Sequence, residues 1–152
     1  MAEIIQLAQL FPRFVEEDDN ASLLEKVSLE ELKEVIHSFP HDKSLGPNGW
    51  TIEFYLGFID LIGNDLLGVV EESRRTGVIH GPINATFIAL IPKVNKVESF
   101  DDFRPISLCN CLYKIIAKGI SRRIKRVLSK NISLEQFGFL QGRQVHEAIG
   151  VA

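Results

Sequence analysis

Five basic side chains recur at every fourth position in the segment between residues 110 and 130. They are Lys114, Lys118, Arg122, Arg126 and Lys130. Four residues advance an α-helix by about 6 Å, which is similar to the phosphate spacing along a nucleic-acid strand. No acidic residue occurs from Lys114 to Lys130. The row could therefore follow a phosphate backbone and neutralise it.

An apolar row is offset from this basic row by two positions, about 200° around a helix. Its members are Leu112, Ile116, Ile120, Ile124 and Leu128. We expect one helix over residues 110–129 with an apolar face opposite a cationic face. Three interpretations of the cationic face stay open: a solvated surface, a surface for RNA or DNA, and a surface for an anionic membrane.

The charge of the chain is divided unevenly between its two parts. Residues 1–92 carry 6 Lys and Arg against 15 Asp and Glu, whereas residues 93–152 carry 11 against 5. Only the second part suits a polyanion, and such asymmetry indicates nucleic-acid contact weakly.

Three other patterns do not meet the requirements of the chemistry that they suggest. His37 and His41 have the spacing of zinc ligands on a helix, but Pro40 lies between them. The loop Gly46–Gly49 is followed by Trp50 and not by the Lys of a phosphate-binding loop. Asp101 and Asp102 follow a polar segment, and we expect exposed loop or capping groups. We therefore predict no metal site in this chain.

The first 80 residues have the signals of helices. Helical apolar spacing covers residues 2–14, and we interpret the acidic run of residues 16–19 as a solvated loop. Ser28 begins a capping box, and the apolar face that follows ends at Pro40. Thr51 can cap a helix that reaches Arg75 with a break near Gly63, and Gly77 suits its C-cap.

The following residues predict two strands before the basic helix. Residues 85–91 are rich in β-formers, almost continuously apolar and stopped by Pro92, which is typical of a buried strand. A shorter strand is expected at 106–108, with a hairpin-like loop over 94–102. We also expect a capped helix from Ser133 and a further helix over 144–152. The class is therefore α+β, with a small incomplete sheet.

The composition limits the setting of the protein. At 45% hydrophobic and 24% charged residues, the 152 residues suit a globular body. No apolar run approaches the roughly 18 to 20 residues of a membrane span, and the start lacks the features of a signal peptide. We expect an intracellular protein with no membrane partner. Cys109 and Cys111 are too few and too close for a disulfide framework, so we interpret them as packed thiols.

Four blocks of sequence, in order, resemble the reverse transcriptases of non-LTR retrotransposons of the LINE type. Their residues are similar to those of elements abundant in plant genomes. The blocks are Asp42 to Trp50, Phe87 to Lys93 together with Asp102 to Leu108, Leu112 to Lys118, and Gln136 to Ile149. The resemblance implies a helical N-terminal extension over 1–41 and, over 42–152, part of the fingers of a right-hand RNA-directed DNA polymerase.

The resemblance also implies roles for individual residues. Lys93 and Arg104 would grip the triphosphate of the incoming dNTP, as a compact charge and a two-pronged donor can. A salt bridge from Arg104 to Asp101 or Asp102 is the structural alternative. The residues implied to contact RNA template and DNA primer are Lys43, Gly46, Gly142 and Arg143, together with the basic row of the helix.

Leu45 and Asn48 depart from the commoner Pro and Asp of the first block. The chain also ends before the palm aspartates that would hold two Mg²⁺ ions, so we expect no cofactor on this chain and no synthesis by it alone. The expected partners are template, primer, dNTP and the palm and thumb of the same polyprotein. The alternative is a noncatalytic nucleic-acid-binding module that uses the helix at 110–130.

Overall fold

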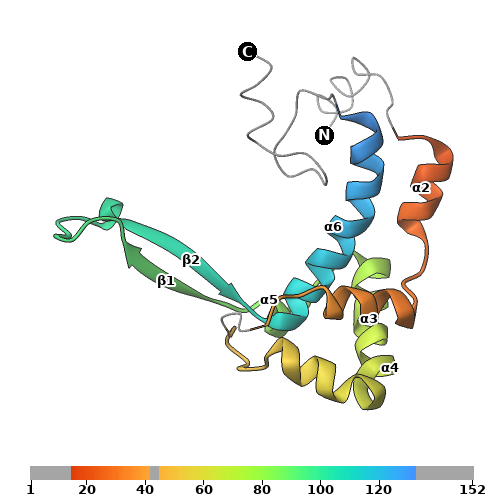
Figure 1. The fold of residues 1–152 in the computed structure, drawn as a ribbon, viewed down its shortest axis with the longest axis horizontal. Coiled ribbons are helices and arrows are strands. Elements are labelled where there is room, and N and C mark those ends of the chain that lie inside the picture. The colour runs from red at the N-terminus through yellow and green to blue at the C-terminus, as the bar shows by residue number, and fades with distance from the viewer. Residues whose placement is uncertain (1–14, 42–44, 133–152) are drawn as a thin grey trace. The chain divides into compact units, whose positions relative to one another are not determined.

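The computed structural model describes residues 15–41 and 45–132, and its elements are shown in Figure 1. These residues form five α-helices and one two-stranded antiparallel sheet, which confirms the expected α+β class. The chain divides into two compact units. Among the described residues, one unit holds 26–41 and 45–120, and the other holds 15–25 and 121–132. The expected helices at 2–14, from Ser133 and over 144–152 lie outside the described residues.

Helix α3 (Leu29–His37) begins where the sequence predicted. The Ser28 hydroxyl accepts a hydrogen bond from the backbone N–H of Glu31 at 3.1 Å and so satisfies a donor that the first turn leaves open. Leu32, Val35 and Ile36 are buried on one face of this helix, which confirms the predicted apolar stripe.

Helix α4 (Ile52–Thr76) packs against α3. Thr51 caps its first turn and Gly77, at φ 68°, ends it in the left-handed conformation, as predicted. The predicted break near Gly63 is wrong, because the helix continues through this residue. A Cβ at Gly63 would lie 3.1 Å from the Leu29 side chain, so the glycine gives α3 room.

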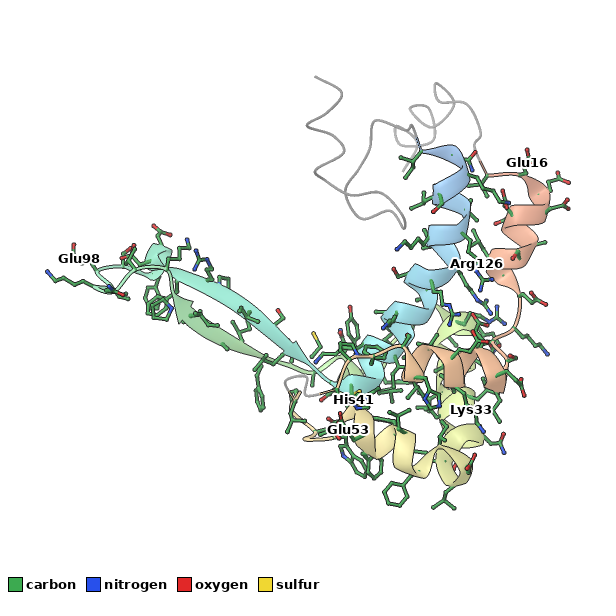
Figure 2. The ribbon with its side chains drawn as sticks, viewed as in Figure 1. Glu16, Lys33, His41, Glu53, Glu98 and Arg126 are labelled. Carbon is green, nitrogen blue, oxygen red and sulfur yellow. The ribbon has the colours of Figure 1, made fainter. Side chains whose placement is uncertain are left out.

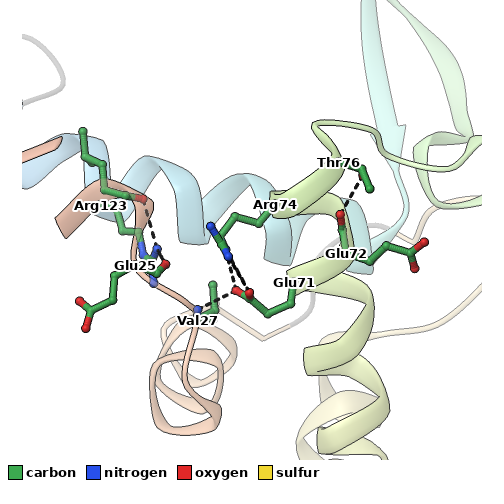
Figure 3. A network of polar contacts seen from close by, with 8 residues as sticks. Glu25, Val27, Glu71, Glu72, Arg74, Thr76 and Arg123 are labelled. Atoms are coloured by element: carbon green, nitrogen blue, oxygen red, sulfur yellow. Dashed lines mark hydrogen bonds and ion pairs between the residues drawn. The ribbon is translucent and has the colours of Figure 1, made fainter. Parts of the chain in front are cut away.

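Polar contacts join the start of α3 to the end of α4 (Figure 3). The backbone N–H of Val27 donates to the Glu71 carboxylate at 2.7 Å. Arg74, one turn further along α4, donates to the same carboxylate at 2.9 Å. The Glu71 carboxylate therefore binds both the backbone just before α3 and a cation on its own helix.

An apolar core lies between α3, α4 and the first part of α6 (Cys111–Asn131). Its buried members are Leu32, Val35, Ile36, Ile52, Tyr55, Leu66, Val70, Cys111, Ile115 and Ile116. The predicted apolar face of α6 is partly wrong, because Ile120 and Ile124 are 52% and 42% exposed. The buried residues of α6 include Cys111, Ile115 and Val127, which are not in the predicted apolar row. The apolar spacing within a helix does not specify which residues its packing partners will cover.

Strands β1 (Thr86–Pro92) and β2 (Phe103–Cys109) form an antiparallel hairpin that follows the short helix α5 (Gly81–Asn84). A 3₁₀ turn at Phe100–Asp102 closes the connection, and Glu98 marks this end of the hairpin in Figure 2. The predicted loop at 94–102 is confirmed, and β2 is longer than the predicted 106–108.

The prediction that β1 is buried is wrong for the described residues. Phe87, Ile88, Leu90 and Ile91 are 45% to 66% exposed. Successive residues point to opposite faces of a strand, so both faces of this hairpin present apolar side chains. The apolar run was typical of a strand covered on both sides, and the cover does not come from residues 15–41 or 45–132.

The second unit contains α2 (Glu17–Leu24) and the end of α6. The interpretation of residues 16–19 as a loop is wrong, because Glu17, Asp18 and Asp19 form the first turn of α2, where carboxylates favour the positive end of the helix dipole. Arg123 donates to the backbone carbonyls of Leu23 and Glu25 and so binds the last turn of α2 (Figure 3). No helix among the described residues is long and apolar enough to cross a membrane.

Two glycines of α4 provide a test of this packing. Gly57 faces open space, whereas Gly63 faces Leu29. We expect Gly57→Ala to stabilise the chain by about 0.5–1 kcal/mol, because alanine loses less backbone entropy in a helix. Gly63→Ala should stabilise the chain less, or destabilise it, because the Leu29 side chain must move. Urea unfolding measures both variants, and an equal gain at both positions would contradict the close approach of Leu29.

Candidate nucleotide and nucleic-acid site

Lys93 and Arg104 lie at the same end of the hairpin. Ile91 lies opposite Arg104, and the backbone N–H of Lys93 donates to the Asp102 carbonyl at 2.7 Å, which extends the ladder by one step. Lys93 directly follows β1, and Arg104 is two residues beyond Asp102, the hydrogen-bond partner of Lys93. Two cations at this end of the hairpin can meet the phosphates of one ligand.

The Lys93 ammonium already has one partner on the hairpin. Its Nζ donates to the backbone carbonyl of Asp101 at 2.7 Å. The contact is with a neutral carbonyl and leaves two further ammonium protons for an anion. Lys93 is exposed, so a phosphate can approach it directly.

The structural alternative for Arg104 was a salt bridge to Asp101 or Asp102. Within the described part of the chain, Arg104 forms no ion pair with either carboxylate, and its side chain lies on an exposed position of β2. Asp102 instead closes the 3₁₀ turn, where its carboxylate accepts from the backbone N–H groups of Glu98 and Ser99 at 2.9 and 3.0 Å. These two hydrogen bonds lower the pKa of Asp102. The prediction that Asp102 is a capping group is confirmed.

The loop that follows residue 44 is held in place by Asn110, which lies between β2 and α6 and is 1% exposed. The Asn110 Oδ1 accepts from the backbone N–H of Asn48 at 3.0 Å. Its Nδ2 donates to the carbonyls of Pro82 and Ile83 at 2.8 and 3.3 Å. One side chain thus joins the loop to α5, directly before β1.

Gly46 fits against the same residue. A Cβ at position 46 would lie 2.4 Å from the Asn110 backbone nitrogen, so no larger residue can take this place without movement. The turn is closed by a hydrogen bond from the Gly49 N–H to the Gly46 carbonyl at 3.0 Å. The glycine of the first sequence block therefore has an internal packing role, and its contact with template stays a prediction.

Tyr55 and Cys111 complete the buried surroundings of this loop. Burial raises the pKa of Tyr55, while a side-chain hydrogen bond with Asn48 opposes that rise. Burial also raises the pKa of the Cys111 thiol, which keeps it in its neutral form. Neither cysteine forms a disulfide, and Cys111 packs in the core as the sequence predicted.

The basic row of α6 is partly used inside the protein. The Lys118 ammonium donates to the Ser38 carbonyl at 2.6 Å and lies 4.0 Å from the centre of the Phe39 ring. Lys130 binds the Asp19 carboxylate at 2.8 Å, and this hydrogen bond raises the lysine pKa. Lys114 and Arg122 also have interactions within the chain. Arg126 is exposed (Figure 2). Nucleic-acid contact by this row stays a prediction.

Lys43, Gly142 and Arg143 lie outside the described residues. In the part of the chain that is described, no three His, Cys, Asp or Glu side chains are grouped so that they could hold a metal ion. Asn110 was not among the residues predicted from the sequence. A polar residue between two apolar segments, at the start of a predicted helix, would have suggested a cap, but its side chain bonds the loop and α5 instead.

The chain is related to a protein encoded by a transposon. It is 34% identical over 123 residues to the Transposon TX1 uncharacterized 149 kDa protein of Xenopus laevis. The matched region is 81% of this chain and 9% of that protein, so the chain spans less than a tenth of its relative. No protein-family profile matches the sequence.

Replacement of Asn110 tests whether this side chain holds the loop. We expect Asn110→Ala to lower the free energy of unfolding by about 2–4 kcal/mol, because a buried N–H and two carbonyls lose their partner. Asn64→Ala is the control, since Asn64 is exposed on α4, and it should change the free energy by less than about 0.5 kcal/mol. Equal urea midpoints for the two variants would remove the proposed role of Asn110.

The turn at the end of the hairpin should depend on pH. The folded pKa of Asp102 is lower than its unfolded pKa, so its stabilising effect is present above the unfolded pKa and is lost as the pH falls through the folded value. We expect the NMR signals of the Glu98 and Ser99 amides to shift across that acid range. Asp102→Asn removes the titrating group and should abolish the response. If the Glu98 and Ser99 signals still shift with pH in this variant, a group other than Asp102 causes the shift.

Proposed function

We propose that this chain is part of a transposon-encoded reverse transcriptase, an RNA-directed DNA polymerase, and that β1 and β2 belong to its fingers. The observation that carries the proposal is that two exposed cations, Lys93 and Arg104, lie at the same end of the hairpin. The relationship to a transposon protein supports the transposon origin in this proposal. In this proposal the hairpin binds the triphosphate of the incoming dNTP.

The two side chains suit different parts of this task. Arg104 can donate two parallel hydrogen bonds to phosphate oxygens from its planar guanidinium group. Lys93 adds a compact charge, and its bond to the Asp101 carbonyl holds the ammonium near the turn until phosphate replaces that carbonyl. Because Asp102 is occupied by the Glu98 and Ser99 amides, its carboxylate does not neutralise Arg104.

The rest of the polymerase would come from other parts of the parent protein. Nucleotide transfer needs carboxylates that hold two divalent ions, and the described residues contain no such group. The proposal therefore places the Mg²⁺ ligands in a palm outside these residues. That palm and the thumb would also cover the apolar faces of the hairpin and bring template and primer to it.

A titration with nucleotides tests the triphosphate site. We expect the 152-residue chain to bind all four dNTPs with similar affinity and to bind the nucleosides without phosphate far more weakly. Arg104→Ala should weaken dNTP binding about tenfold or more, because a charge-assisted hydrogen bond contributes about 1.5–3 kcal/mol. The measurement is the change in hairpin NMR signals.

The control is Lys96→Ala, which removes a lysine from the connection between the same two strands. Lys96 is exposed and lies close to Glu98, at 3.2 Å, so its loss should leave dNTP affinity nearly unchanged. If Lys96→Ala and Arg104→Ala had the same effect, the binding would be general attraction by positive charge and the proposed site would be wrong.

A further inference from the structure

Three cations lie on one side of α6, and two of them bind α2. Arg123, Arg126 and Lys130 are spaced by three and four residues, so they fall within about 60° of one another around the helix axis, and they are named the cationic sector. Arg123 donates to the carbonyls at the end of α2, and Lys130 binds Asp19 in its first turn. The two helices therefore lie side by side, with a contact near each end of α2 (Figure 1).

The charges of these two neighbouring segments are complementary. Residues 16–25, named the acidic segment, contain five Asp and Glu and no Lys or Arg, whereas residues 121–132 contain five Lys and Arg and no Asp or Glu. The hydrogen bond with Asp19 and the charge of Asp19 raise the pKa of Lys130, and the charge of Glu16 adds to this rise. The acidic segment therefore places carboxylates where the phosphates of a polyanion would meet α6.

The attachment of α2 to α6 includes no buried side chain of α2. No residue of α2 is buried, and Glu16 makes no side-chain hydrogen bond that caps its first turn. Lys130 is 66% exposed in its pair with Asp19, and ion pairs exposed to water add little stability and weaken with salt. A helix of eight residues is too short to persist alone in water. A stronger anion can therefore displace α2, and the displaced segment would lose its helical structure.

We propose that the acidic segment is an internal competitor of nucleic acid, which covers the cationic sector of α6 until a nucleic-acid strand displaces it. The inference rests on the proposed function, because it takes the displacing polyanion to be template or primer. A strand carries one phosphate for each nucleotide and gains from the release of its counterions, so it can replace several carboxylates together. A single nucleotide carries too few phosphates to do so and leaves α2 in place.

Neutralisation of the acidic segment tests this competition in the complete 152-residue chain. The probe is a fluorescein-labelled oligouridylate of about 12 nucleotides, and binding is followed by fluorescence anisotropy at constant salt. We expect Glu16→Gln combined with Asp19→Asn to raise the affinity about fivefold or more, which is the lower end of typical coupling between linked binding events. The matched control, Glu34→Gln with Asp65→Asn, removes the same charge from exposed positions of α3 and α4 and should raise it far less. Equal gains in the two variants would overturn the proposal.

Hydrogen exchange measures whether the strand displaces α2. The backbone N–H of Asn20 donates to the Glu16 carbonyl at 2.9 Å in the first turn of the helix. We expect this amide and those of residues 21–24 to exchange faster when the oligouridylate is bound, and to exchange at the same rate with and without UTP. If these amides exchange equally fast in the free chain and in the RNA complex, α2 is not displaced and the proposal is wrong.

Arg126 tests whether RNA binds to the cationic sector once α2 has left it. Arg126 is exposed in the middle of the sector (Figure 2). We expect Arg126→Gln to weaken RNA binding by the neutralised chain and to reduce its salt dependence, because one phosphate contact is lost. Unchanged binding would place the RNA elsewhere and would also overturn the proposal.

Two further outcomes count against the inference. If vesicles that contain phosphatidylserine displace α2 and RNA does not, the competing polyanion is a membrane surface. If RNA binds to neither the original nor the neutralised chain, α6 is not a nucleic-acid surface and the inference fails. The dNTP titration then still decides the proposed function, because the hairpin shares no residue with α2 or α6.

Discussion

The buried amide of Asn110 is the constraint on which the proposed site depends. An amide in an apolar environment must have hydrogen-bond partners, because each unpaired group costs about 1–3 kcal/mol. The partners of Asn110 are a loop N–H at Asn48 and two carbonyls before β1. These bonds hold the segment directly before β1, where the hairpin begins. The uncharged Asn110 therefore helps to position the hairpin that carries Lys93 and Arg104.

The hairpin differs from the buried surroundings of Asn110, because its strands are regularly paired but its side chains are mostly exposed. Its register is set by backbone hydrogen bonds and by the turn that Asp102 closes. Two strands alone are marginal in water, and here both faces carry exposed apolar residues such as Phe87 and Ile88. The backbone positions of the two cations are therefore defined by the hairpin, while the apolar side chains of the hairpin are left uncovered by the described residues.

The features that could be predicted from the sequence are those with local causes. Ser28 and Thr51 begin helices and Gly77 ends one, through bonds or backbone angles within a few residues, and the structure confirms all three. The hairpin was also predicted, because its two strands and the polar connection between them are consecutive in the sequence. The exposure of β1 and the buried side of α6 were predicted wrongly, because burial depends on partners distant in the sequence. Asn110 was missed for the same reason, as its partners are 27 to 62 residues away.

Lys118 shows why a charge pattern alone is weak support for binding. In the sequence it is one member of a regular cationic row, indistinguishable from its neighbours. In the structure its ammonium binds the Ser38 carbonyl, just beyond the end of α3, and lies over Phe39. Lysine near a helix C-terminus stabilises it through the exposed carbonyls and the helix dipole. A regular spacing of cations can therefore arise from contacts within the protein.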